Sequence, residues 1–223
     1  MRDGSTTRER IRTEALRLFV AHGVDAVSIR DIAGAAGCRP SALYAHWPSR
    51  EALVAALFRD GFTEYARRLA ALADSPTPFA ARLEAMVRLI CRLHAEDPAR
   101  FAFLLLTQHR RLPAIAADAD NPIEVLQRAI ADAMRDGELP AGDAALVTSA
   151  VVGILVQAAT FHLYGRLAAP PEALADPLVA LCLVAAGLAP AAGAGDGTDT
   201  DTGAAPRHEP RTMPRRQTED TPS

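Results

Sequence analysis

The sequence predicts an all-α protein with an N-terminal three-helix helix-turn-helix domain joined to a larger C-terminal helical domain. Apolar residues recur with the spacing of an α-helix along most of the chain, and helix start and stop signals bracket these segments. No segment shows the alternation typical of a strand. The 223 residues are 49% hydrophobic and 23% charged, which is enough chain for a sizeable core.

The first fifty residues contain three predicted helices. Residues 6–22 and 28–36 each begin with a serine or threonine that an acidic residue follows three positions later, which is the capping-box pattern. Gly37 ends the second segment, because a glycine takes the positive φ that a sharp turn requires. A third helix is predicted at residues 40–47, with Pro40 in the first turn, where proline is tolerated.

The chain from residue 51 to residue 189 is predicted to form a helical bundle. A long helix starts after Ser49 and carries an aromatic and apolar face of Phe58, Phe62, Tyr65 and Leu69. Further helices are predicted to start near residues 79, 98, 122, 143 and 176. Two of them begin with proline after a capping residue.

Composition and charge divide the chain into three parts. Residues 1–50 carry eight arginines against five acidic residues, whereas residues 51–189 carry twelve against sixteen. The whole chain has a net charge of −3, so the basic N-terminal part is where a nucleic-acid partner is expected. Residues 190–223 lack aromatic side chains and are expected to be disordered.

Residues 28–50 have the layout of a helix-turn-helix, whose second helix enters the major groove of DNA while the first crosses the backbone. This part of the chain resembles the tetracycline-repressor (TetR/AcrR) family of transcriptional regulators. The resemblance rests on Ile11–Gly23, Val27–Ala33, Ala36–Gly37, Leu43–Tyr44 and His46–Leu53. Two positions depart from the family pattern, since Trp47 replaces a usual phenylalanine and Arg50 a common lysine. The resemblance implies a DNA-binding domain, a helical domain that binds a small ligand, and a homodimer built from the last two core helices.

The predicted DNA contacts lie on the two helices of this motif and at the start of the next helix. Arg39 is the candidate base reader, because a forked guanidinium can bond guanine O6 and N7; a phosphate contact is the alternative. Family resemblance implies phosphate contacts for Tyr44 and His46, although Tyr44 can also pack against the first helix. A plain N-cap is the alternative role of Ser28. The expected set is Ser28, Arg30, Arg39, Ser41, Ala42, Tyr44, His46 and Arg50.

Polar residues inside the apolar C-terminal helices are candidates for a ligand pocket. They are His94, Thr148, Gln157, Thr160, His162 and Tyr164. For each of them, a locally satisfied or dimer-facing side chain is an equal alternative. Residues 144–161 carry no charge, which favours a largely apolar or aromatic effector.

Other classes of protein find little support in the sequence. Cys91 and His94 lie at helical spacing, but no second pair completes a tetrahedral set, so neither a metal nor a cofactor is expected. No catalytic motif is present, and we predict no enzymatic activity. We interpret residues 144–161 as a buried helix and expect no membrane partner. Three widely spaced cysteines, and no apolar leader after Met1, favour a cytoplasmic protein with reduced thiols.

The predicted function is therefore a ligand-responsive transcriptional repressor that binds a palindromic operator as a homodimer. Its expected partners are double-stranded operator DNA and a small, mostly apolar effector that releases the protein from DNA. The alternative is a helical small-molecule-binding or enzymatic protein that retains the helix-turn-helix as a scaffold.

Overall fold

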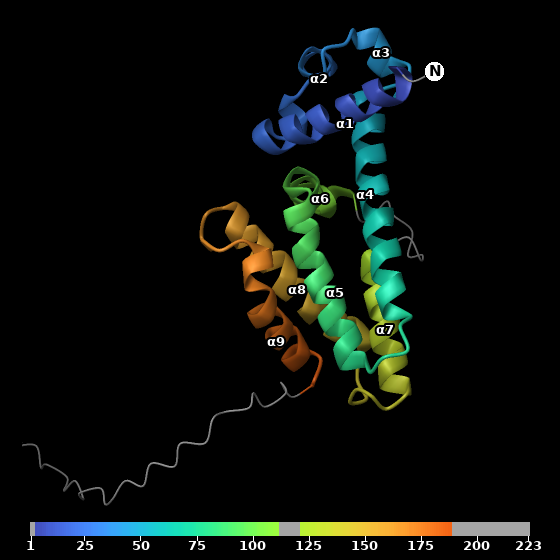
Figure 1. Ribbon diagram of the computed structural model, residues 1–223, viewed down its shortest axis with the longest axis vertical. Coiled ribbons are helices and arrows are strands. Elements are labelled where there is room, and N and C mark those ends of the chain that lie inside the picture. Colours follow the sequence, from blue (N-terminus) through green and yellow to red (C-terminus); the bar gives the residue numbers. More distant parts are fainter. Residues whose placement is uncertain (1–2, 112–120, 189–223) are drawn as a thin grey trace, which may run out of the picture. The chain divides into compact units, whose positions relative to one another are not determined.

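The computed structural model describes residues 3–111 and 121–188, and every regular element in these two ranges is helical (Figure 1). The predicted all-α class is therefore confirmed. Residues 190–223, for which we expect disorder, lie outside the described residues. The elements in chain order are α1 (Asp3–His22), the 3₁₀ turn η1 (Val24–Ala26), α2 (Ile29–Ala35), α3 (Pro40–Tyr44), α4 (Arg50–Ala73), α5 (Phe79–Glu96), α6 (Pro98–Arg111), α7 (Pro122–Arg135), α8 (Ala144–Leu163), the 3₁₀ turn η3 (Pro171–Leu174) and α9 (Ala175–Ala185).

Local capping determines where α2 begins and how the chain leaves it. The backbone N–H of Ser28 donates to the Asp31 carboxylate at 2.8 Å, and the N–H of Asp31 donates to Ser28 Oγ at 3.3 Å. This is the capping box that the sequence predicts, and the hydrogen bonds from Ser28 lower the pKa of Asp31. Gly37, with φ of 61°, then turns the chain toward α3.

Two boundaries of the N-terminal helices differ from the prediction. α1 begins upstream of Thr6, so this residue lies inside the helix instead of capping it. α3 ends at Tyr44 rather than at Trp47. The N–H groups of His46 and Trp47 both donate to the carbonyl of Leu43 at 3.0 Å, which closes the last turn of the helix.

The core of the three N-terminal helices is continuous with the core of the other helices. Ile11 of α1 and Leu43 of α3 are fully buried. Phe19 of α1 stacks on Phe103 of α6, with the ring centroids 5.9 Å apart. Within the described residues, the three N-terminal helices and the helices that follow them belong to one compact unit.

α4 connects the N-terminal helices to the helical bundle. Its first turn is capped by Ser49, whose Oγ accepts a hydrogen bond from the N–H of Ala52 at 3.0 Å. The helix then packs against α5, α6 and α7, as Figure 1 shows. The face predicted from the sequence is buried in these contacts and contains Phe58, Phe62, Tyr65 and Leu69.

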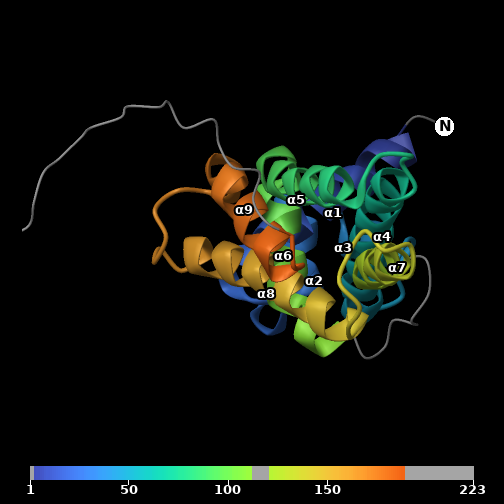
Figure 2. The same cartoon turned by 90° about the horizontal axis from the view of Figure 1, so that it is seen from below.

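The last two helices bury little of their apolar surface. α8 is long and apolar enough to cross a membrane, and only 17% of its most apolar stretch is buried. Leu146 of α8 and Leu181 of α9 are 67% and 55% exposed. The prediction that residues 144–161 form a buried helix is therefore wrong. α9 lies on the side opposite α4 in both views, and part of the α8–α9 surface is uncovered by the described chain (Figure 2).

Candidate DNA-binding surface and ligand cavity

A groove between α2 and α3 brings together four of the eight residues predicted to contact DNA. Ser28 and Arg30 line it from the start of α2, Tyr44 from the end of α3, and Arg50 from the start of α4. The side chains of Ser28, Arg30 and Tyr44 are exposed. The groove therefore presents polar and cationic groups of two adjacent helices on one surface, as phosphate binding requires.

The other four predicted residues follow the N-terminus of α3 and the turn after it. Arg39 is the residue before α3 and is exposed, as is Ser41, whereas Ala42 is half-buried. His46 is exposed but follows the end of α3, so it is not part of the helix as predicted. In the described part of the chain, no hydrogen bond or ion pair holds the guanidinium of Arg39, which leaves its five donors available to a ligand.

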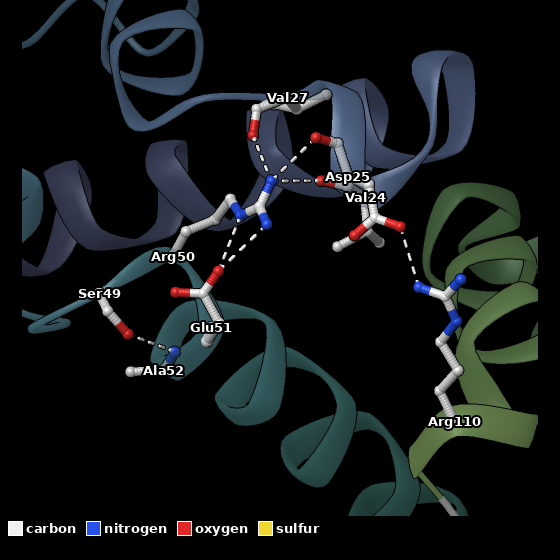
Figure 3. Close-up of polar contacts among 8 residues, drawn as sticks. All are labelled: Val24, Asp25, Val27, Ser49, Arg50, Glu51, Ala52 and Arg110. Atoms are coloured by element: carbon white, nitrogen blue, oxygen red, sulfur yellow. Dashed lines mark hydrogen bonds and ion pairs between the residues drawn. The ribbon is translucent and has the colours of Figure 1, made fainter.

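Arg50 differs from Arg39, because its guanidinium binds the protein itself (Figure 3). Nη1 donates to the carbonyl oxygens of Val24 and Asp25, both at 3.1 Å, and of Val27 at 3.3 Å. Nε donates to the Glu51 carboxylate at 3.1 Å. The structure therefore places Arg50 as a residue that holds the η1 turn, a role that the sequence did not predict.

A second arginine reaches the same turn from α6. Nη1 of Arg110 lies 2.9 Å from the Asp25 carboxylate, and both side chains are largely exposed (Figure 3). An exposed ion pair of this kind contributes at most about 1 kcal/mol. The η1 turn is thus held mainly by Arg50 of α4 and is contacted in addition by α6.

A largely apolar cavity of about 130 Å³ lies among α4, α5, α6, α7 and α8. Phe62 and Leu69 of α4, and Phe101 of α6, form part of its wall. Among the described residues that line the cavity, Tyr65 and Gln108 have hydrogen-bonding side chains, and none is charged. An apolar cavity with a few polar groups is typical of small-molecule sites.

None of the six residues predicted for the pocket lines this cavity. Thr148 and Thr160 donate their hydroxyls at 2.7 Å to carbonyls one turn earlier in α8. Gln157 and Tyr164 are exposed. The polar residues of α8 are thus satisfied by their own helix or by solvent, which is the alternative that the sequence left open.

His94 and His162, the other two predicted pocket residues, lie beside each other, with ring centroids 5.4 Å apart. Nδ1 of His94 is 2.8 Å from the Glu172 carboxylate. Burial raises the pKa of Glu172, but hydrogen bonds from its own backbone and from His94 lower it by more. Within residues 3–111 and 121–188, no group of three or more His, Cys, Asp or Glu side chains is placed to hold a metal ion.

The fold and this surface define a helix-turn-helix protein with an attached helical bundle. Residues 11–57 match the family described as bacterial regulatory proteins, tetR family. The chain therefore carries the N-terminal module of the tetR family, and the resemblance found in the sequence is confirmed. No curated protein sequence matches the chain.

Solved structures with the same fold cover most of the described chain. FadR from Bacillus subtilis, in complex with stearoyl-CoA, has a TM-score of 0.68 at 15% identity and covers 80% of this chain and 98% of its own. The TetR-family regulator PfmR from Thermus thermophilus has a TM-score of 0.64 at 23% identity and covers 78% and 97%. AibR, in complex with isovaleryl coenzyme A and operator DNA, has a TM-score of 0.61 at 18% identity and covers 79% and 97%.

The role of Arg50 can be separated from that of a phosphate contact. Arg50→Ala removes a charged donor from three carbonyls in and directly after the η1 turn, so we expect the free energy of unfolding to fall by about 1–3 kcal/mol. Arg30→Ala is the matched control, because Arg30 is exposed and its loss leaves no described partner unpaired. Urea unfolding of both variants measures the difference. An unchanged stability for Arg50→Ala, together with a smaller salt dependence of DNA binding, would show that Arg50 binds phosphate instead.

Proposed function

We propose that the chain is a ligand-responsive transcriptional repressor that binds a palindromic operator as a homodimer and is released by a small, mostly apolar effector. The proposed partners are double-stranded DNA, the effector and a second copy of the chain, in the cytoplasm. The proposed DNA contacts are the residues of the α2–α3 surface that keep free polar groups, with Arg39 as base reader and Arg30 and Tyr44 as phosphate contacts.

The observation that carries this proposal is the path of α4. The helix begins with Arg50, which holds the turn before α2, and three turns later its side chains Phe62, Tyr65 and Leu69 line the cavity. One continuous helix therefore contacts both the turn that precedes the helix-turn-helix and a site of the size and polarity of a small-molecule site.

This arrangement supports a coupling between the cavity and the DNA-binding surface. A ligand that fits the cavity better in one position of α4 shifts the population of that position, and Arg50 carries the shift to the η1 turn. α6 lines the same cavity and reaches the turn through Arg110. In a dimer, two half-sites one helical turn apart require recognition helices about 34–36 Å apart, so a changed spacing weakens DNA binding.

The structural neighbours support the choice of partners. One was solved with an acyl coenzyme A, and another with an acyl coenzyme A and operator DNA together. These complexes support the proposal that a small molecule and operator DNA are the two ligands of this chain. The particular effector of this chain is a separate question, which depends on its own cavity.

The exposed apolar surface of α8 and α9 supports the homodimer. Leu146, Leu181 and Val184 are more than half exposed, and large apolar patches of this kind are typical of protein interfaces. A two-fold interface places the same surface of both copies in contact, so one face covers the other.

DNA binding is tested with a site that the full chain selects from a random DNA pool. We expect Arg39→Ala to weaken binding to this site by about 1–3 kcal/mol, and by far less once the contacted base pair is substituted. Arg30→Ala is expected to weaken binding to all sequences and to lower the salt slope by about one. Fluorescence anisotropy at several salt concentrations measures both effects.

The matched control for these variants is Arg128→Ala, which removes an exposed arginine of α7 far along the chain from the helix-turn-helix. It should leave DNA affinity unchanged. If neither Arg30→Ala nor Arg39→Ala changes DNA affinity, the proposed function fails. The alternative, a helical ligand-binding or enzymatic protein with the motif as scaffold, then becomes the better account.

The homodimer is tested by placing a charge on its proposed interface. Leu181→Glu puts a carboxylate on the exposed face of α9, where burial in a dimer is costly without a partner. We expect the wild type at micromolar concentration to have twice the chain mass of 23.7 kDa by light scattering, and this variant to have the chain mass. Leu106→Glu, at an exposed site on α6, is the control and should remain dimeric. A monomeric wild type refutes the proposed assembly.

A further inference from the structure

The hydroxyl of Tyr65 is the unusual feature of the cavity. Tyr65 is 7% exposed and lines the wall, yet its Oη is buried without a hydrogen-bond partner among the described residues. A buried hydroxyl that makes no hydrogen bond is costly, and native proteins rarely keep one without a ligand or water to receive it. A polar atom of a cavity occupant that reaches this oxygen would satisfy it.

The hydroxyl of Tyr65 is a hydrogen-bond donor at neutral pH. Burial raises the pKa of Tyr65, and this effect outweighs the opposing influence of Arg100. The side chain is then uncharged at neutral pH and carries its proton. An occupant that offers an acceptor oxygen satisfies it.

Charged side chains near Tyr65 are already paired with one another. The guanidinium of Arg68 binds the Glu96 carboxylate through two hydrogen bonds, at 2.5 and 2.9 Å. Arg100 lies 3.3 Å from the Asp97 carboxylate. None of these four residues lines the cavity, so the wall offers no free charge to neutralise a carboxylate or an ammonium group.

The size of the cavity limits the buried part of an occupant. A volume of about 130 Å³ is close to that of apolar cavities that hold one benzene molecule. One ring, or a branched group of similar volume, fills such a space. A longer molecule has to leave its remaining atoms outside this volume.

We infer that the effector buries a small uncharged group in this cavity, and that an acceptor oxygen of this group, of the carbonyl type, receives a hydrogen bond from Tyr65 Oη. The inference rests on the proposed function, because it takes the cavity as the effector site. It assigns Tyr65 the selection of a neutral oxygen-bearing ligand over a hydrocarbon of the same shape, and the uncharged wall the rejection of a carboxylate.

The test uses three probes built on one six-membered ring: cyclohexanone, methylenecyclohexane, in which a CH₂ group replaces the oxygen, and cyclohexanecarboxylate, which is larger and charged. Ligand-observed NMR titration at pH 7.5 measures their affinities for the full-length wild type, Tyr65→Phe and Tyr164→Phe. We expect the wild type to bind the ketone and to reject the carboxylate. Tyr65→Phe should lower the affinity ratio of ketone to alkene about threefold to tenfold, because one neutral hydrogen bond is lost.

Tyr164→Phe is the matched control, since Tyr164 is an exposed tyrosine outside the cavity wall, and it should leave the ratio unchanged. Thermal melts check folding, and Tyr65→Phe should be at least as stable as the wild type because it loses an unpaired buried hydroxyl. The inference is overturned if Tyr65→Phe keeps the wild-type ratio, if the carboxylate binds more tightly than the ketone, or if neither neutral probe shows saturable binding at millimolar concentration.

The same samples separate this inference from the proposed function. DNA affinity is measured with and without saturating cyclohexanone. A ketone that binds through Tyr65 but leaves DNA affinity unchanged supports the ligand class and contradicts ligand-responsive regulation. If the protein binds DNA but neither neutral probe, the inferred class of ligand is contradicted, whereas the proposed DNA-binding function is not.

Discussion

The hydrogen bonds between Arg50 and the η1 turn link the start of α4 to the helices of the predicted DNA-binding motif. The carbonyl oxygens of Val24 and Asp25 in this turn, and of Val27 directly after it, accept hydrogen bonds from one guanidinium nitrogen of Arg50. Glu51, from the first turn of the same helix, balances the charge. Because α2 starts directly after the turn, its N-terminus and the capping box of Ser28 are fixed relative to α4. Arg50 therefore joins the start of the proposed DNA-binding motif to the helix that lines the cavity.

The sequence predicted the helix-turn-helix well because its signals are local. The Ser28 capping box, Gly37 and the prolines at the starts of α3, α6 and α7 each act within one turn of backbone, so their effect follows from the residues themselves. Two predictions were wrong where the outcome depends on packing. α3 ends early, and α8 leaves much of its apolar surface exposed in the described chain. An apolar pattern alone does not distinguish a helix that its own chain buries from one that keeps an apolar face uncovered.

The residues that line the cavity could not be predicted from the sequence, because their positions also depend on packing. The prediction selected polar residues in apolar helices, but Thr148 and Thr160 satisfy their hydroxyls within α8 and need no ligand. Among the residues that line the cavity, Tyr65 has a buried hydroxyl without a partner in the described chain, and the sequence placed this residue correctly on the apolar face of α4. Its pattern is that of a core residue, and only the three-dimensional arrangement shows that no acceptor among the described residues meets its hydroxyl.

The central claim is that a ligand in the cavity acts on the η1 turn through Arg50, and hydrogen–deuterium exchange of the full chain tests it most directly. With saturating cyclohexanone, the account predicts changed exchange in residues 24–36 as well as in α4 and α6. In Arg50→Ala, measured well below its melting temperature, the change in α4 and α6 should persist while the change in residues 24–36 is lost. Protection confined to the cavity helices of the wild type, with residues 24–36 unaffected, would contradict the account.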